Sequence, residues 1–146
     1  MFPKITLTDA PDDNALRTIS RQITEFNQAA SERPNDFRPL AVLLSDPETG
    51  ETLGGLWGWT SFAFLHIDLL IVPQSLRGSG LGRTMMLQAD AEAIERGCHG
   101  AWLDTFSFQA RGFYERLGYT VFGSIEGYPP GHSRFFLKKS LGEAEV

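Results

Sequence analysis

A glycine-rich turn between a predicted strand and a predicted helix constrains the fold of this chain more than any other feature. It reads Arg-Gly-Ser-Gly-Leu-Gly-Arg-Thr over residues 77–84, shortly after a strand-like run that ends at Val72-Pro73. At such a helix start, amide N–H groups lack partners and the helix dipole is positive, so the turn can hold an anion such as phosphate. It is not a dinucleotide-binding fingerprint, because Arg83 replaces the last glycine, and it is not a P-loop, because no Gly-Lys-Ser/Thr follows.

The chain before this turn is expected to contain a strand, a long helix and a meander. Residues 4–7 alternate in polarity, which predicts an edge strand. Asp12 and Asp13 are suitable N-caps for a helix that runs toward Ala30. The apolar residues of this helix recur every three or four positions, on one face: Leu16, Ile19, Ile23 and Phe26.

The middle of the chain predicts a sheet with both kinds of strand pairing. Strand-like runs over residues 40–44, 52–60 and 63–72 predict an antiparallel meander. A helix is expected over residues 81–96, followed by a short strand over residues 101–103. This order of strand, helix and strand predicts a parallel crossover.

The last part of the chain predicts one more helix and a hairpin. The helix begins near Gln109 and ends at Gly118. Residues 119–125 and 133–138 have strand-like patterns, and the run rich in glycine and proline between them predicts the hairpin turn. The sequence therefore predicts an α/β (α+β) chain.

Composition and charge exclude several classes of protein. With 146 residues, of which 42% are hydrophobic, the chain is expected to fold as one domain over residues 1–146. Its 13 basic and 18 acidic side chains give a net charge of −5, which makes nucleic acid a poor partner. No apolar run is long enough for a bilayer, so no membrane partner is expected. A single cysteine, Cys98, and the absence of a signal-peptide pattern favour a cytoplasmic location.

Two motifs, in order, make the chain similar to a known family. Residues 72–84 resemble the pyrophosphate loop of the GNAT superfamily of acyl-CoA-dependent N-acyltransferases, which follows a strand ending in Val-x-Pro. Residues 110–119 match the family's second motif, a helix with Ala-x-x-x-Tyr that ends in Gly-aromatic. The order of elements over residues 4–138 is also similar. The resemblance implies a mixed, mostly antiparallel central sheet of about six to seven strands flanked by helices, with a splayed pair of parallel strands at the acyl-CoA site.

The resemblance also implies an activity. It predicts an N-acetyltransferase that moves an acetyl group from acetyl-CoA to a primary amine of a small molecule, by direct attack within a ternary complex. Acetyl-CoA is then the co-substrate, and no metal is expected. A homodimer is consistent with the assemblies that members of the family form. Two alternatives stay open: a non-catalytic acyl-CoA-binding or sensor module, and an acetyltransferase that acts on protein lysines or N-termini.

Coenzyme A contacts are assigned by the same resemblance. Loop amides and arginines would hold the pyrophosphate, and the edge of the preceding strand would pair with pantetheine. The amide of Val72 is expected to stabilise the oxygen of the attacked thioester. Ser107 stands where many members have asparagine, which weakens that contact. The assigned residues are Leu70, Ile71, Val72, Arg77, Gly78, Ser79, Gly80, Gly82, Arg83, Thr84, Ser107, Gln109 and Phe113.

Tyr114 matches the family position whose hydroxyl protonates the departing thiolate. A phenol with a pKa of about 10 is a weaker acid than a thiol with a pKa of about 8.5. Proton donation therefore requires a tuned environment or simple hydrogen bonding to sulfur. The structural alternative for Tyr114 is a core aromatic beside Phe113.

The general base is where the chain departs from the family. Many members carry Glu six residues before the valine of the loop motif, whereas this chain has His66 there and Asp68 two residues later. Strand alternation predicts that His66, Asp68 and Leu70 share one face. His66 can accept a proton, and Asp68 can orient it, act as base through water, or bind a cationic acceptor. A core histidine and a structural carboxylate are the alternatives, and Asp104 and Thr105 are secondary candidates.

By resemblance, residues 31–39 and the hairpin tip at residues 128–132 would wall the acceptor pocket. Aromatic side chains elsewhere either line an apolar amine site or belong to the core, and the core interpretation is favoured. These are Phe37, Trp57, Trp59, Phe62 and Phe64. Polyamines, amino acids, antibiotics, small aromatic amines and protein lysines all stay open as acceptors.

Overall fold

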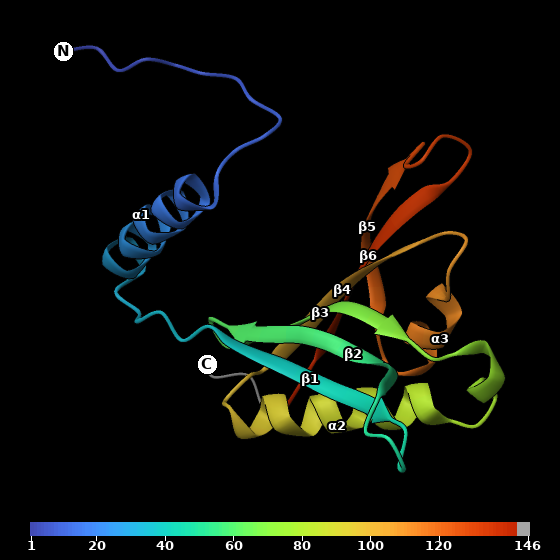
Figure 1. The fold of residues 1–146 in the computed structure, drawn as a ribbon. Helices are drawn as coiled ribbons and strands as arrows, with labels where there is room; N and C mark the ends of the chain where they lie inside the picture. The colour runs from blue at the N-terminus through green and yellow to red at the C-terminus, as the bar shows by residue number, and fades with distance from the viewer. Residues whose placement is uncertain (143–146) are drawn as a thin grey trace. The chain divides into compact units, whose positions relative to one another are not determined.

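The computed structural model of the chain describes residues 1–142. These residues divide into two compact units, one that ends at Asn35 and one that begins at Asp36. The first unit contains one helix, and the second contains a six-stranded sheet with its own helices (Figure 1). None of the helices in the described range combines the length and the apolar character that a membrane span requires.

Helix α1 (Asp13–Ser31) confirms the predicted N-terminal helix. Its N-cap is Asp12, whose carboxylate accepts a hydrogen bond from the Ala15 amide at 2.7 Å. The helix ends at Glu32, which has a left-handed backbone with a φ of 57°. No side chain of α1 is buried. The predicted strand over residues 4–7 is wrong, because this segment has no neighbouring strand with which to form a ladder.

The second unit begins with the predicted antiparallel meander. It consists of β1 (Arg38–Ser45), β2 (Thr52–Ser61) and β3 (Phe64–Ile71). A short 3-10 helix, η1 (Gln74–Leu76), then leads into the glycine-rich turn. The order of these elements agrees with the order predicted from the sequence.

A β-bulge interrupts the ladder between β2 and β3 at Asp68, which has no partner on β2. Its neighbours Ile67 and Leu69 both have partners. A bulge bends a strand and changes the face that each later side chain takes. The prediction that His66, Asp68 and Leu70 share one face is therefore wrong, because His66 and Leu70 lie on opposite faces of the sheet.

The rest of the second unit also follows the predicted order. It consists of α2 (Leu81–Glu95), β4 (Gly100–Phe106), α3 (Arg111–Arg116), β5 (Thr120–Glu126) and β6 (Ser133–Ser140). Helix α2 connects β3 to β4, which run parallel, as the crossover predicts. Strands β5 and β6 form the predicted hairpin, and the sheet order is β1-β2-β3-β4-β6-β5.

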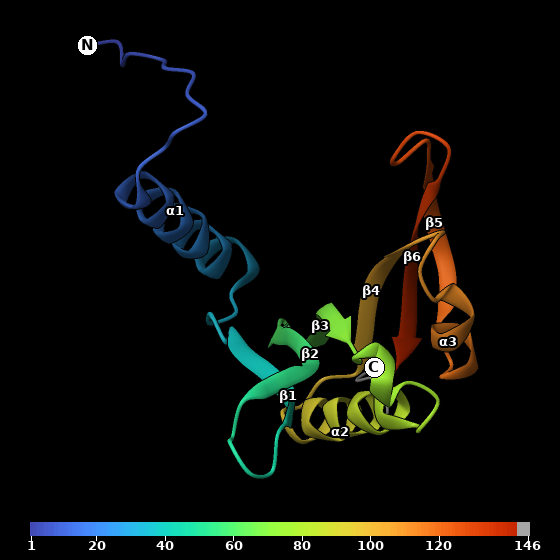
Figure 2. The ribbon, with the colours of Figure 1, turned by 45° about the vertical axis from the view of Figure 1, so that its right-hand side comes forward.

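The parallel pair β3 and β4 separates along its length. Its ladder ends where Ile67 lies opposite Leu103, although β3 continues to Ile71 and β4 continues to Phe106. Beyond that pair, the two strands present backbone edges that do not bond to each other. Figure 2 shows β4 and the β5–β6 hairpin turning away from the meander. The predicted fold class is confirmed, with six strands and a single parallel pair.

The core of the second unit lies between α2, α3 and one face of the sheet, which we call the inner face. Residue Arg96, just after α2, fixes that helix, because its guanidinium donates to the Pro39 carbonyl and to the Thr60 hydroxyl, each at 3.1 Å. The buried hydrophobic residues are Leu40, Leu56, Leu65, Ile67, Met85, Met86, Ala89, Ala93, Cys98, Ala101, Leu103, Tyr119, Leu137 and Leu141.

One ion pair is partly enclosed between α2 and β6. The carboxylate of Asp90 lies 2.6 Å from the Lys139 ammonium, and the two side chains are only 10% and 19% exposed. The Lys139 ammonium also lies 5.6 Å from the centroid of the Tyr119 ring. Because each charge is largely removed from water, each depends on the other.

We expect Asp90→Ala to lower the free energy of unfolding by about 3 kcal/mol, because it leaves the Lys139 ammonium without its counter-charge in a desolvated site. Urea denaturation measures this change. Glu95→Ala, on an exposed position of the same helix, is the matched control and should stay within about 0.5 kcal/mol of the parent. An equal loss in both variants would show that the ion pair contributes nothing specific.

Candidate active site

The glycine-rich turn forms the N-terminus of α2, and its geometry requires glycine. Gly78 and Gly80 both have a φ of 82°, a left-handed conformation that other residues rarely adopt. Gly80 is the N-cap of α2 and has no side chain with which to satisfy the first amides of the helix. Those amides are left facing the turn with the positive end of the helix dipole. The geometry that the sequence predicts for an anion site is therefore present.

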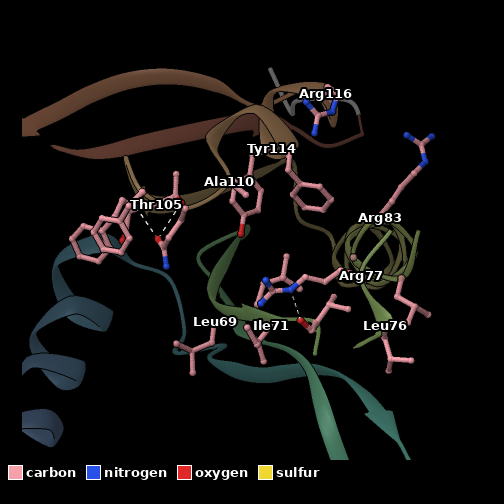
Figure 3. A pocket seen from close by; sticks show the side chains of 18 of the residues that line it. Leu69, Ile71, Leu76, Arg77, Arg83, Thr105, Ala110, Tyr114 and Arg116 are labelled. Atoms are coloured by element: carbon pink, nitrogen blue, oxygen red, sulfur yellow. Dashed lines mark hydrogen bonds between the residues drawn. The ribbon is translucent and has the colours of Figure 1, made fainter. Parts of the chain in front are cut away.

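Arginines add positive charge around this turn. The Arg77 Nε donates a hydrogen bond to the Val72 carbonyl at 3.0 Å, which holds the guanidinium at the end of β3. Arg83 of α2 and Arg116 of α3 line the same cavity (Figure 3). Three guanidinium-bearing residues around one cavity favour a ligand with more than one negative charge.

A cavity of about 1180 Å³ lies between the diverging ends of β3 and β4 and extends to the glycine-rich turn and α3. Typical small-molecule sites occupy roughly 300–1,000 Å³, so this cavity has room for a large ligand. Its lining includes most of the residues assigned from the sequence. They are Asp68, Leu70, Ile71, Val72, Arg77, Gly78, Gly80, Gly82, Arg83, Gln109, Phe113 and Tyr114.

Tyr114 extends from α3 into this cavity, and its hydroxyl points toward β3 (Figure 3). Burial raises the pKa of the Tyr114 hydroxyl above its ordinary value, and the negative charge of Asp104 raises it further. The hydroxyl therefore keeps its proton at neutral pH. It is suited to donate a hydrogen bond to a ligand atom in the cavity.

His66 lies beside the cavity and is not among its lining residues. Its imidazole is buried between the rings of Trp59 and Trp102, with centroid separations of 4.6 Å and 4.0 Å. Its Nε2 lies 3.8 Å from the Asp68 Oδ1, and its buried Nδ1 has no hydrogen-bond partner among the described residues. Burial lowers the pKa of His66, against the opposing attraction of Asp68 and Asp104. His66 is therefore neutral at pH 7.

Asp68 connects this histidine to the cavity. Its side chain is 47% exposed and lines the cavity, and one of its carboxylate oxygens faces the His66 Nε2. As the bulge residue of β3, it sits at the point where the β3–β4 ladder has just ended. The arrangement places a carboxylate at the cavity wall with a neutral imidazole behind it.

Comparison with known proteins identifies the family. The profile of the acetyltransferase (GNAT) family matches residues 9–119. The chain belongs to this family. It is 40% identical over 130 residues to Blasticidin-S acetyltransferase of Streptomyces morookaense, in an alignment that covers 86% of this chain and 96% of that protein.

Solved structures agree with the assignment. The acetyltransferase superposes on a candidate acetyltransferase from Agrobacterium tumefaciens with a TM-score of 0.89 and 32% identity, over 95% of this chain and 100% of that one. An acetyltransferase from Bacillus cereus ATCC 14579 gives a TM-score of 0.80 and 31% identity, over 93% and 98% of the two chains. The resemblance and the acyl-CoA-dependent acetyltransferase activity expected from the sequence are confirmed.

Three assigned hydroxyl residues are not among the lining residues of the cavity in this acetyltransferase. The Ser79 hydroxyl donates to the Leu76 carbonyl at 2.5 Å, and the Thr84 hydroxyl donates to the Gly80 carbonyl at 3.1 Å. The Ser107 hydroxyl accepts a hydrogen bond from the Ser133 amide at 3.0 Å. These hydroxyls stabilise the local backbone of the turn and of the end of β4.

Sequence reasoning missed part of the cavity wall. Arg134, on β6, binds Asp104, on β4, with N–O distances of 2.6 Å and 2.8 Å. Nothing in the local sequence pairs these two residues, because the β4–β6 ladder brings them together. The lining residues missed or named only as secondary candidates are Leu69, Leu76, Leu81, Asp104, Thr105, Phe106, Phe108, Ala110, Arg116 and Arg134. Within residues 1–142, no group of three or more His, Cys, Asp or Glu side chains is arranged to hold a metal ion.

We expect Gly82→Leu to weaken acetyl-CoA binding at least about tenfold, which corresponds to about 1.4 kcal/mol. A Cβ at Gly82 would lie 3.2 Å from the Phe113 Cζ and 3.8 Å from a Val72 methyl carbon, so a larger side chain must displace α3 or enter the cavity. Isothermal titration calorimetry measures the affinity. Gly123→Leu is the control, since nothing lies within 4 Å of a Cβ at that position. Equal affinity in all three proteins would contradict the assignment of the loop.

We expect the pH dependence of stability to identify His66 as a buried neutral group. Its pKa is lower in the folded chain than in the unfolded chain, where it is near 6.5. The unfolded chain therefore binds the proton more readily, and the free energy of unfolding decreases as the pH falls below about 6.5. Urea denaturation at several pH values should show that His66→Gln loses this contribution. His132→Gln, at an exposed histidine, should keep it.

Proposed function

We propose that this acetyltransferase transfers an acetyl group from acetyl-CoA to a primary amine of a small molecule, by direct attack within a ternary complex. The observation that carries the proposal is the cavity between the separated ends of β3 and β4, with the N-terminus of α2 at one end and Asp68 on its wall. One end of the cavity suits an anion, and the carboxylate suits a cationic amine. Residues 1–146 are proposed to act as one domain, since the family match spans both units.

Coenzyme A is proposed to lie along the edge of β3. The amides at the start of α2, together with Arg77 and Arg83, would hold the pyrophosphate. From residue 68 to Ile71, β3 has no ladder with β4, so its backbone groups on that side are free to pair with the amide groups of pantetheine. Phe113 contacts this path through its close approach to Gly82.

The thioester would then lie between Val72 and Tyr114. The amide of Val72 is proposed to donate a hydrogen bond to the carbonyl oxygen, which becomes negative as the amine attacks. A bond forms between the amine nitrogen and the acetyl carbon, and the bond between that carbon and sulfur breaks. The Tyr114 hydroxyl donates a hydrogen bond to the departing sulfur, and a proton transferred along this bond yields the free thiol. The attacking nitrogen, which is positively charged after the new bond forms, gives up a second proton through water, which restores the Tyr114 hydroxyl and leaves a neutral amide.

The amine must lose a proton before it attacks, since an alkylamine with a pKa near ~10 is almost fully protonated at pH 7. Asp68 is proposed to bind the ammonium group at the cavity wall. His66, neutral and 3.8 Å from the Asp68 carboxylate, would accept the proton through that carboxylate or through water. This relay uses both residues that the sequence offers as candidate bases.

A small-molecule acceptor is supported by the relative named Blasticidin-S acetyltransferase, whose name describes acetylation of a small molecule. The cavity wall beyond Asp68 combines the rings of Phe106 and Phe108, which stack at 5.2 Å, with the ion pair of Asp104 and Arg134. Such a wall suits an acceptor that combines a planar or apolar part with polar groups. The cytoplasmic location stays a prediction from the sequence.

We expect Tyr114→Phe to lower kcat by about 10²-fold while the Kd for acetyl-CoA changes by less than about twofold, because the hydroxyl acts mainly on the leaving group. Thermal unfolding with and without acetyl-CoA reports binding, and release of free thiol with a panel of small amines reports turnover. Tyr119→Phe is the matched control: its ring is buried outside the cavity, and its hydroxyl has no hydrogen-bond partner in the described structure.

The outcomes separate the competing functions. Stabilisation by acetyl-CoA without thiol release across the amine panel would favour a sensor module. An unchanged kcat in Tyr114→Phe would show that the Tyr114 side chain has a structural role and takes no part in turnover. No stabilisation at millimolar acetyl-CoA would contradict the proposed donor.

A further inference from the structure

The cavity has a second carboxylate besides that of Asp68. The last pair of the β3–β4 ladder is Ile67 and Leu103, so Asp68 and Asp104 are the first residues of the two separated segments. Both of these aspartates line the cavity. If both carboxylates were free at this point, their combined charge would favour an acceptor with two positive charges.

Arg134 neutralises one of these two carboxylates. Its guanidinium nitrogens lie 2.6 Å and 2.8 Å from the Asp104 Oδ1, and the Arg134 and Asp104 side chains are only 26% and 21% exposed. The Arg134 Nη1 also donates a hydrogen bond to the Tyr128 hydroxyl at 2.9 Å, which holds the guanidinium in place. Asp68 instead faces the neutral His66 imidazole at 3.8 Å, so its negative charge stays available to an acceptor.

The same ion pair makes this part of the wall a poor site for an acidic acceptor. The positive charge of Arg134 is compensated by Asp104, so little of it is left to attract a carboxylate. The other arginines of the lining lie away from Thr105, toward the glycine-rich turn (Figure 3); they are Arg77, Arg83 and Arg116. The wall around Asp104 and Arg134 is therefore polar and close to neutral in charge.

Two stacked rings, which we call the aromatic shelf, lie beside this ion pair. Phe106 is directly opposite Arg134 in the β4–β6 ladder, and the Phe108 ring stacks on the Phe106 ring with an interplanar angle of 7° and a centroid separation of 5.2 Å. Both rings line the cavity, and Phe108 is 57% exposed, so part of its ring is open to a ligand. A planar ring placed against the aromatic shelf gains a stacking interaction that a saturated ring of similar size does not.

The aromatic shelf is held in place by the tip of the β5–β6 hairpin. The Ser107 amide donates to the Ser133 carbonyl at 2.8 Å, and the Ser133 amide donates to the Ser107 hydroxyl at 3.0 Å. The rings of Tyr128 and His132 lie against the two rings of the shelf, with centroid separations of 5.6 Å and 5.0 Å. A surface that is already ordered loses less conformational entropy when a ligand binds.

We propose that the aromatic shelf and the Asp104–Arg134 ion pair form an acceptor subsite for an uncharged planar ring, while Asp68 binds the ammonium group that is acetylated. The acceptor is then a primary amine that carries an uncharged aromatic or heteroaromatic ring. Polyamines are disfavoured because the second carboxylate is neutralised, and acidic amines are disfavoured because the guanidinium is compensated. This proposal rests on the proposed function, since it selects among the small amines that the proposed function leaves open.

Thiol release from acetyl-CoA with two amines of similar size tests the aromatic shelf. Phenethylamine carries a planar ring, and cyclohexylethylamine carries a puckered ring on the same chain. We expect kcat/KM to be about fivefold higher for phenethylamine in the wild-type chain, and Phe108→Leu to remove this preference. Phe122→Leu, at an exposed ring of β5 that does not line the cavity, is the matched control and should keep it. Absence of the preference in the wild-type chain, or its survival in Phe108→Leu, would overturn the role of the shelf.

Substitutions in the ion pair should change which charge the acceptor prefers to carry. Arg134→Gln leaves the Asp104 carboxylate unpaired, so kcat/KM for the diamine cadaverine relative to pentylamine should rise about tenfold. Asp104→Asn leaves the guanidinium unpaired, so the ratio for aminovalerate, which carries a carboxylate, relative to pentylamine should rise by a similar factor. Lys138→Gln removes a positive charge from the same strand outside the cavity and should change neither ratio. A general loss of folding lowers both rates of a pair and does not change their ratio, so unchanged ratios in both ion-pair variants would overturn the proposal.

Thermal unfolding with and without acetyl-CoA, measured on the same samples, separates this proposal from the proposed function. None of the substituted residues is assigned to coenzyme A, so every variant should be stabilised by acetyl-CoA as the wild-type chain is. Absence of thiol release with all of these amines in the wild-type chain would contradict the proposed function, and this proposal with it. Thiol release without the ring preference and without the change in charge preference would contradict this proposal alone.

Discussion

The site depends on one constraint, which is that β3 and β4 stop pairing after Ile67 and Leu103. The break coincides with the bulge at Asp68, the residue of β3 that has no partner on β2. A bulge increases the local bend and twist of a strand, so the extra residue turns the end of β3 away from β4. Two strand ends that no longer satisfy each other's backbone groups leave hydrogen-bonding capacity that a ligand can use.

Helix α2 adds a positively charged end to the cavity between β3 and β4. Its N-cap Gly80 follows β3 after η1 and the glycine-rich turn, and Arg96 fixes its other end to the Pro39 carbonyl of β1 and the Thr60 hydroxyl of β2. Its positive end therefore has a defined place beside the separated strands. The cavity between the strands then has a cationic end at the glycine-rich turn and a carboxylate, that of Asp68, on its wall.

Burial determines the protonation states at this site. His66 and Tyr114 are both removed from water, and desolvation disfavours the charged form of each. Desolvation lowers the pKa of the His66 imidazole and raises the pKa of the Tyr114 phenol. Both are therefore neutral at pH 7, one able to accept a proton and the other able to donate a hydrogen bond. Asp68, half-exposed on the cavity wall beside His66, supplies the negative charge.

The sequence by itself determined the elements whose cause is local. Glycines in the turn, the Asp12 cap and the apolar spacing of the helices fix backbone conformations within a few residues, so the order of strands and helices, the turn at α2 and the position of Tyr114 were all predictable. The tertiary structure alone decided the bulge that separates His66 from Leu70, the pairing of Arg134 with Asp104, and the failure of residues 4–7 to form a strand. Each of these depends on which distant strand lies alongside, and no periodicity within a single segment encodes its neighbour.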